Sequence, residues 1–205
     1  MSNSRGITTF ILTLGFTVLI FTACEPQAER ERVGVATPSP AVGVTPSPAV
    51  TGTPAAPLTS SDREFMMNAA REGMMEVQMG TLAAQKALSN DVKQLGESMA
   101  TTHSQLGQKL QQLASYLNVT LPQDLKPEQQ NVLNRLEKLS GKVFDREYLK
   151  AMISDHTKDI SEFERATSQV SNPEIKQFAS EALPALRDHL KAARELAGKL
   201  GVKAE

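Results

Sequence analysis

The chain has 205 residues, with 22 Lys and Arg against 23 Asp and Glu and a formal net charge of −1 at pH 7. Charges of both signs alternate and aromatic residues make up 4% of the chain, so the sequence has neither the basic stripe nor the aromatic surface of a nucleic-acid-binding protein. The single cysteine, Cys24, excludes an internal disulfide and the cysteine-rich zinc sites.

Residues 1–23 have the features of an export signal. Arg5 provides a positive start, an apolar stretch follows, and residues 21–23 (Phe-Thr-Ala) precede Cys24. The small residues before this cysteine resemble the lipobox of bacterial lipoproteins, in which the signal is cleaved before the cysteine and the thiol carries lipid. We therefore expect lipidation of Cys24 and attachment to a membrane through that lipid. The alternatives are a plain secretory signal and an uncleaved anchor.

Residues 24–60 are predicted to form a linker. They contain the imperfect repeats TPSPAVGV and TPSPAVTG, followed by TPAAP. A segment rich in Pro, Thr and Ala without apolar periodicity cannot bury a core. Because proline favours extended conformations, we interpret the segment as a spacer that holds the following domain away from the membrane.

Residues 61–201 are predicted to form a domain of four long amphipathic helices. Apolar residues recur there at three- and four-residue steps over about residues 60–89, 91–118, 144–171 and 173–200. Pro122 and Pro127 interrupt the pattern between the second and third helices, and Pro127 begins a short extra helix that ends near residue 139. An all-α, ferritin-like four-helix bundle has one long connection at this position.

Each long helix carries one titratable residue within its apolar stripe. These residues are Glu76, His103, His156 and His189. They lie near the middles of their helices, and because the midpoints of antiparallel helices share one level, we expect the four side chains to converge in the core. Imidazoles together with a carboxylate suit a divalent transition metal. The sequence therefore predicts a site for one such ion at these four residues.

Three aspartates are candidate hydrogen-bond partners of the histidines. Asp145 lies eleven residues before His156, about 20° from it around the helix axis. Asp155 and Asp188 directly precede two of the histidines.

Two glycines flank Glu76 in the first helix. Gly73 and Gly80 each cost helix stability relative to alanine, by about 1 kcal/mol. They indicate either a close approach of another helix or space beside the carboxylate. The methionines of the same helix spread around its circumference, which favours packing over a copper(I) site.

Two other functions are compatible with the same residues. In a structural or stress-related envelope protein without metal, the histidines and Glu76 would form a buried hydrogen-bond network. A metal-dependent oxidase would need an open coordination position and a channel. The Glu-x-x-His pairs of di-iron bundles are absent, because Ala100, Ile153 and Leu186 stand three residues before the histidines. We assign no catalytic residue.

Several short stretches resemble a known family. The most specific are residues 141–148 (GKVFDREY) and 183–190 (LPALRDHL), together with Glu76, Gly80 and His103. They resemble the bacterial family called domain of unknown function 4142, which is similar to ferritin in fold and common among exported proteins. The resemblance covers about residues 61–200 and implies a ferritin-like domain in the periplasm or at the outer membrane. It implies no activity, since none is established for the family.

Overall fold

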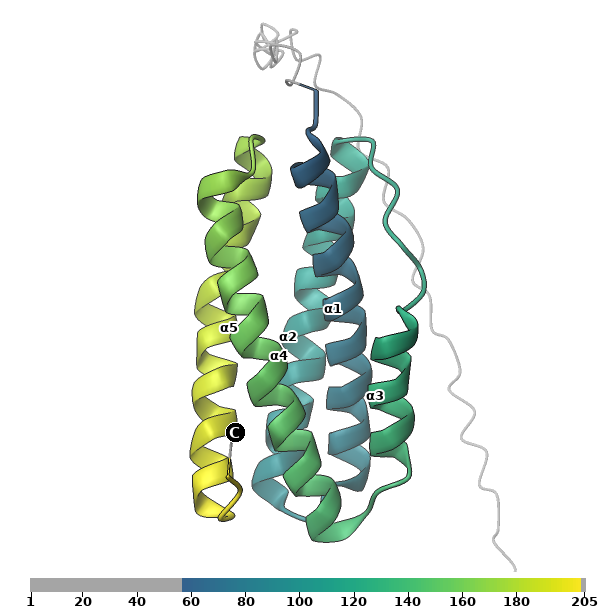
Figure 1. Ribbon diagram of the computed structural model, residues 1–205, viewed down its shortest axis with the longest axis vertical. Coiled ribbons are helices and arrows are strands. Elements are labelled where there is room, and N and C mark those ends of the chain that lie inside the picture. Colours follow the sequence, from purple (N-terminus) through teal and green to yellow (C-terminus); the bar gives the residue numbers. More distant parts are fainter. Residues whose placement is uncertain (1–56, 204–205) are drawn as a thin grey trace, which may run out of the picture. The chain divides into compact units, whose positions relative to one another are not determined.

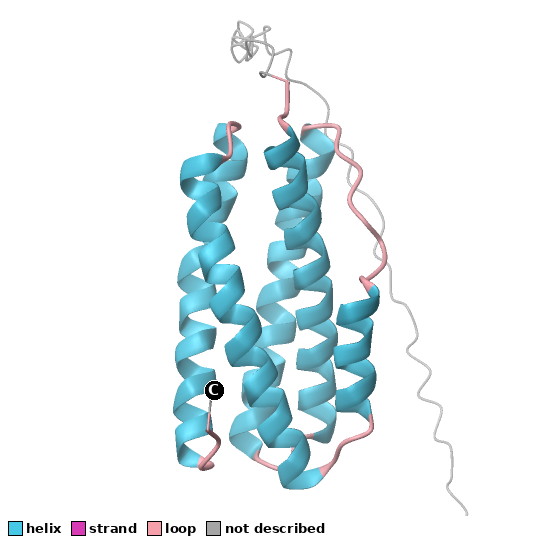
Figure 2. Ribbon diagram, viewed as in Figure 1, coloured by secondary structure: helices cyan, strands magenta, loops and turns pink. Residues whose placement is uncertain are grey.

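The computed structural model describes residues 57–203, so the predicted signal, Cys24 and nearly all of the linker lie outside the described residues. This range contains the helices α1 (Ser60–Lys86), α2 (Asn90–Tyr116), α3 (Pro127–Glu137), α4 (Gly141–Gln169) and α5 (Pro173–Lys199), and no strand (Figures 1 and 2). The prediction of four long helices and one short one is confirmed. Among these helices, none combines the length and the apolar character needed to span a lipid bilayer.

The order of the helices in space is that of a ferritin-like bundle. α1 and α2 form one antiparallel hairpin, and α4 and α5 form another. The connection between the hairpins runs back along the bundle, and its helix α3 packs against α1 and α4 (Figure 1). α2 and α4 therefore run in the same direction, and each long helix has two antiparallel neighbours.

The first helix is fixed at its start by one buried carboxylate. Asp62 accepts a hydrogen bond from the backbone N–H of Thr59 (2.8 Å), whose hydroxyl in turn accepts one from the Asp62 N–H (3.1 Å). The other oxygen of Asp62 accepts from the N–H groups of Ser171 (2.7 Å) and Asn172 (3.2 Å). This side chain thus caps α1 and ties it to the turn between α4 and α5.

The two glycines that flank Glu76 serve two different purposes. A Cβ atom on Gly80 would lie 2.6 Å from the carbonyl oxygen of Gly96, and one on Gly96 would lie 2.6 Å from that of Gly80. α1 and α2 therefore touch through their backbones at this level. A Cβ atom on Gly73 would meet nothing within 4 Å, so this glycine leaves space instead.

The core consists of two apolar blocks with polar side chains between them. One block contains Phe144, Tyr148 and Met99, and the other contains Phe65, Phe163 and Phe178, whose rings pack edge to face or tilted. The buried methionines of α1 belong to these blocks, as expected of packing residues. The side chains between the blocks are called the polar layer below: Glu76, His103, His156, Asp159 and His189.

Candidate metal centre

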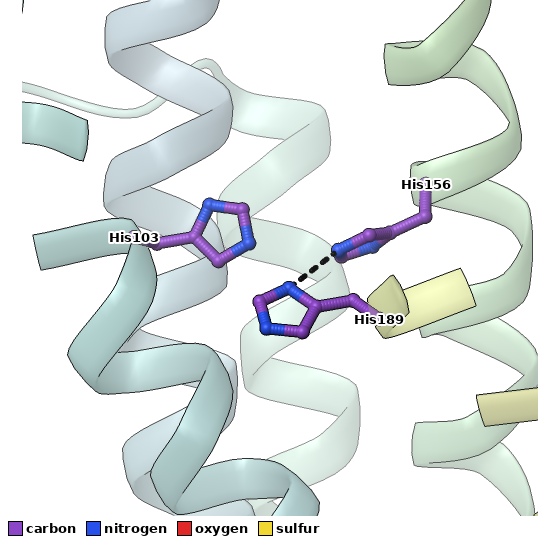
Figure 3. Close-up of side chains that lie close together, drawn as sticks. All are labelled: His103, His156 and His189. Atoms are coloured by element: carbon purple, nitrogen blue, oxygen red, sulfur yellow. Dashed lines mark hydrogen bonds between the residues drawn. The ribbon is translucent and has the colours of Figure 1, made fainter. Parts of the chain in front are cut away.

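The four residues predicted from the sequence meet in the polar layer. Their exposed fractions are 2% for Glu76, 3% for His103, 0% for His156 and 6% for His189. One ring nitrogen of each histidine lies within 4.8 Å of a ring nitrogen of the other two. Figure 3 shows the three rings turned toward one another from α2, α4 and α5. Three helices thus place three nitrogen donors around one point.

Glu76 lies against the outer side of two of these rings. Its Oε2 is 2.9 Å from Nδ1 of His103, and its Oε1 is 3.2 Å from Nδ1 of His156, the second contact without hydrogen-bond geometry. In His103 the other nitrogen, Nε2, is buried and has no partner. In metal sites a carboxylate commonly accepts the N–H of a ligating histidine in this way and orients the ring. Glu76 is thus placed to support the ring of His103, and its role as a metal ligand stays a prediction.

The distance between one nitrogen of His156 and one of His189 suits a tetrahedral ion. His156 Nε2 and His189 Nδ1 are 3.4 Å apart (Figure 3). Two nitrogens bound to Zn²⁺ at about 2.0–2.1 Å in tetrahedral geometry lie about 3.3 Å from each other. The same contact is also compatible with a long hydrogen bond between two neutral rings.

The histidines are held neutral by their surroundings. Burial lowers the pKa of His103 from 6.5 to about 4. Burial is also the main reason why the pKa of His156 is lowered to about 3 and that of His189 to about 4. The second reason is charge repulsion from His103. A neutral imidazole keeps the lone pair that a metal ion needs, so all three rings are in the ligating form at pH 7.

Asp159 is a residue of this site that the sequence analysis missed. It is 5% exposed, and one of its oxygens lies within 4.8 Å of ligand atoms of Glu76 and His156. Burial, followed by the nearby charge of Glu76, raises the pKa of Asp159 well above its usual value. Burial likewise raises the pKa of Glu76. The sequence does contain a signal for Asp159: it stands three residues after His156, and residues three apart share a helix face.

The three predicted supporting aspartates have different positions. Asp145 is buried, but its oxygens accept hydrogen bonds of 2.9 Å from the N–H groups of Leu88 and Ser89. The prediction for Asp145 is therefore wrong, because this carboxylate is engaged at the turn before α2. Asp188 is exposed on α5, and Asp155 is half-buried with an unpartnered Oδ2.

A small cavity adjoins the polar layer. Its volume is about 20 Å³, and Glu76, His103 and Asp159 line it together with Gly73 and Gly107. A cavity of this size holds about one water molecule. A Cβ atom on Gly73 or Gly107 would meet nothing within 4 Å, so the missing side chains of these glycines leave room beside the site.

The fold and the polar layer together define a ferritin-like helical domain with a buried His/Glu group that could bind a metal ion. The chain belongs to the DUF4142 family, described as a domain of unknown function, which it matches over residues 47–196. No match is found among the curated proteins.

Solved structures with the same fold come from proteins of very different sequence. A DUF305 fragment from Deinococcus radiodurans is 12% identical, with 70% of this chain and 99% of that chain covered and a TM-score of 0.63. A DUF305 protein from Streptomyces coelicolor is 15% identical, with 71% and 97% covered and a TM-score of 0.61. At these identities the likeness concerns the fold alone.

Proposed function

We propose that this domain binds one divalent transition metal ion through His103 Nε2, His156 Nε2 and His189 Nδ1. The observation that supports the proposal is the convergence of three buried, neutral imidazoles whose ligand atoms lie within 4.8 Å of one another. The unpartnered Nε2 of His103 is the strongest single indication, since a buried polar atom without a partner costs about 1–3 kcal/mol.

In this proposal Glu76 orients the ring of His103 through its Nδ1 atom, whereas its other oxygen lies 3.2 Å from Nδ1 of His156 without hydrogen-bond geometry. Three protein ligands leave one tetrahedral position for water or another small ligand. A groove between α1 and α2 is lined by Gly73, Gly107 and His103, and we propose that an ion reaches the site from this side.

The test is metal uptake by the purified full-length chain. We expect about one Zn²⁺ or Co²⁺ per chain in equilibrium dialysis, and loss of that ion when the three histidines are replaced together by alanine. Co²⁺ bound by three nitrogens in a tetrahedral site would also show its characteristic visible absorption. Asp145→Asn is the matched control, because it removes a buried charge from α4 outside the polar layer. Equal uptake by wild type and the triple variant would refute the proposal.

A metal-free hydrogen-bond network is the second candidate function. The 2.9 Å contact between Glu76 and His103 and the 3.4 Å contact between His156 and His189 support it. Such a network would specify the helix register, and chelators would leave the melting temperature unchanged. A bound metal would raise the melting temperature, because it binds the native state.

We also propose that the protein acts in the cell envelope, anchored by lipid on Cys24. The sequence before this cysteine supports the proposal, and the Streptomyces coelicolor neighbour is itself named as a candidate secreted protein. In bacteria producing the full chain, we expect it in the membrane fraction with acyl mass on the peptide that contains Cys24. Cys24→Ser should release it. Membrane association that persists in this variant would contradict lipid anchoring.

A further inference from the structure

The polar layer continues beyond the histidines into a group of carboxylates between α1 and α4. Asp159 lies one turn after His156, and Glu72 lies one turn before Glu76. Glu72, Glu76 and Asp159 line the same small cavity. Asp155 is half-buried nearby, close enough to raise the pKa of Asp159 together with the larger effect of burial.

Three oxygens of this group have no donor to satisfy them. Oε1 of Glu76, Oδ2 of Asp155 and Oδ2 of Asp159 are buried without a hydrogen-bond partner. Glu76 and Asp159 are more than nine-tenths buried, and among the described residues neither makes an ion pair with a lysine or arginine. Two carboxyl groups so close together need either a shared proton or a cation.

We propose that Glu76 and Asp159, with Glu72 and Asp155 toward the surface, form a second, oxygen-lined site for a hard divalent cation such as Mn²⁺. Carboxylate oxygens are the ligands that such ions prefer, whereas the three imidazoles suit a softer transition metal. The cavity of about 20 Å³ at these carboxylates provides space for one ion or water.

The two sites would meet at His156 and Glu76. Nε2 of His156 lies 3.4 Å from His189, on the nitrogen side, whereas Nδ1 lies 3.2 Å from Oε1 of Glu76, on the oxygen side. A carboxylate has about four lone-pair positions, so Glu76 can accept the imidazole N–H groups and still contribute to the second ion. This inference shares Glu76 with the proposed function, but the oxygen-lined site does not require the nitrogen site to be filled.

The experiment measures the binding of Mn²⁺ and Zn²⁺, alone and together, by equilibrium dialysis of the full-length chain. We expect wild type to hold one ion of each kind. Asp159→Asn should lose Mn²⁺ binding by at least tenfold in affinity and keep Zn²⁺, whereas His189→Gln should do the reverse. Asp145→Asn is the control, since it also neutralises a buried aspartate of α4 and leaves the polar layer intact.

The outcomes separate this inference from the proposed function. If Zn²⁺ binds but Mn²⁺ does not, or if Asp159→Asn binds Mn²⁺ as tightly as Asp145→Asn does, the second site is refuted and the nitrogen site stands. Mn²⁺ binding without Zn²⁺ binding would refute the nitrogen site alone. A protein that binds neither ion refutes both and leaves a proton shared between Glu76 and Asp159. Paramagnetic resonance gives an independent signature, because Mn²⁺ beside Co²⁺ would show a broadened spectrum that Mn²⁺ beside Zn²⁺ would not.

Discussion

The close contact of α1 and α2 predicts opposite effects for two substitutions in one helix. In Gly80→Ala the new Cβ atom meets the Gly96 oxygen at 2.6 Å and the Ala100 nitrogen at 2.8 Å. Both atoms are backbone, so the helices must separate by about 0.8 Å before the first contact reaches an ordinary 3.4 Å. Overpacking of a core typically costs about 1–3 kcal/mol, and a clash with rigid backbone belongs at the upper end of that range.

Gly73→Ala is the matched control, because its new Cβ atom meets nothing within 4 Å. Alanine is favoured over glycine in a helix by about 1 kcal/mol at both positions, so this term cancels between the two variants. We expect Gly73→Ala to be more stable than wild type by about 1 kcal/mol and Gly80→Ala to be less stable by about 2 kcal/mol. A difference of about 3 kcal/mol corresponds to about 6–12 °C in melting temperature for a domain of this size.

Urea unfolding followed by circular dichroism measures these free energies, and metal uptake provides a second readout. Gly80 lies one turn from Glu76, and its contact Ala100 lies close to His103. Separation of the helices should therefore weaken the contact between Glu76 and His103 and reduce metal affinity in Gly80→Ala. Equal stability of the two variants would refute the inference that α1 and α2 touch through their backbones.

Three further predictions concern the metal, the pH and a turn. Zn²⁺ at 100 times its Kd should stabilise the domain by about 2.7 kcal/mol and raise the melting temperature by about 5–10 °C. A chelator should return the melting temperature to its metal-free value. An unchanged melting temperature on addition of Zn²⁺ would favour the metal-free network. Burial lowers the pKa of His103 from 6.5 to about 4. Between these two pH values the unfolded chain therefore binds more protons than the native one, and the stability that His103 contributes is lost as the pH falls from 6.5 to about 4. In the metal-free protein, His103→Gln should therefore reduce the pH slope of the unfolding free energy, measured in urea, by about 1 kcal/mol per pH unit near about pH 5–6. An identical slope would contradict the neutral, buried state of His103. Asp145→Asn should destabilise the domain by about 1–3 kcal/mol in thermal unfolding, because it weakens the hydrogen bonds from the N–H groups of Leu88 and Ser89. An unaltered melting temperature would contradict the role of Asp145 at the turn.

The helices and the core position of the histidines could be predicted from the sequence because both depend on local periodicity. A stripe with a 3.6-residue period gives the buried face of each helix, and prolines and glycines mark its ends. The convergence of His103, His156 and His189 then follows from one assumption, that midpoints of antiparallel helices share a level.

The partners of the polar groups could not be predicted in the same way. Asp145 shares a helix side with His156, but axial distance decides its contacts: eleven residues place it about 16 Å along the helix, at the turn before α2. The role of Asp159 depends on its distance from Glu76 on another helix, and that distance depends on how closely α1 packs against α4. Glu76 was predicted as a ligand because its burial was evident, whereas its contact with the Nδ1 atoms is a matter of side-chain rotamers.

The division of the core into two apolar blocks has a consequence for cooperativity. The polar layer contributes little apolar burial, so in the metal-free protein two features link the block around Phe144 to the block around Phe163: the continuity of the helices and the half-buried Ile160, which packs against both blocks. Local opening of proteins occurs in such contiguous units, and amide protons at the two ends of the bundle should then exchange at different rates. An ion ligated from α2, α4 and α5 would cross-link the boundary, so that neither end could open without breaking the site. Binding of an ion in the polar layer would thereby slow amide exchange at both ends of the bundle, although no ligating residue lies there.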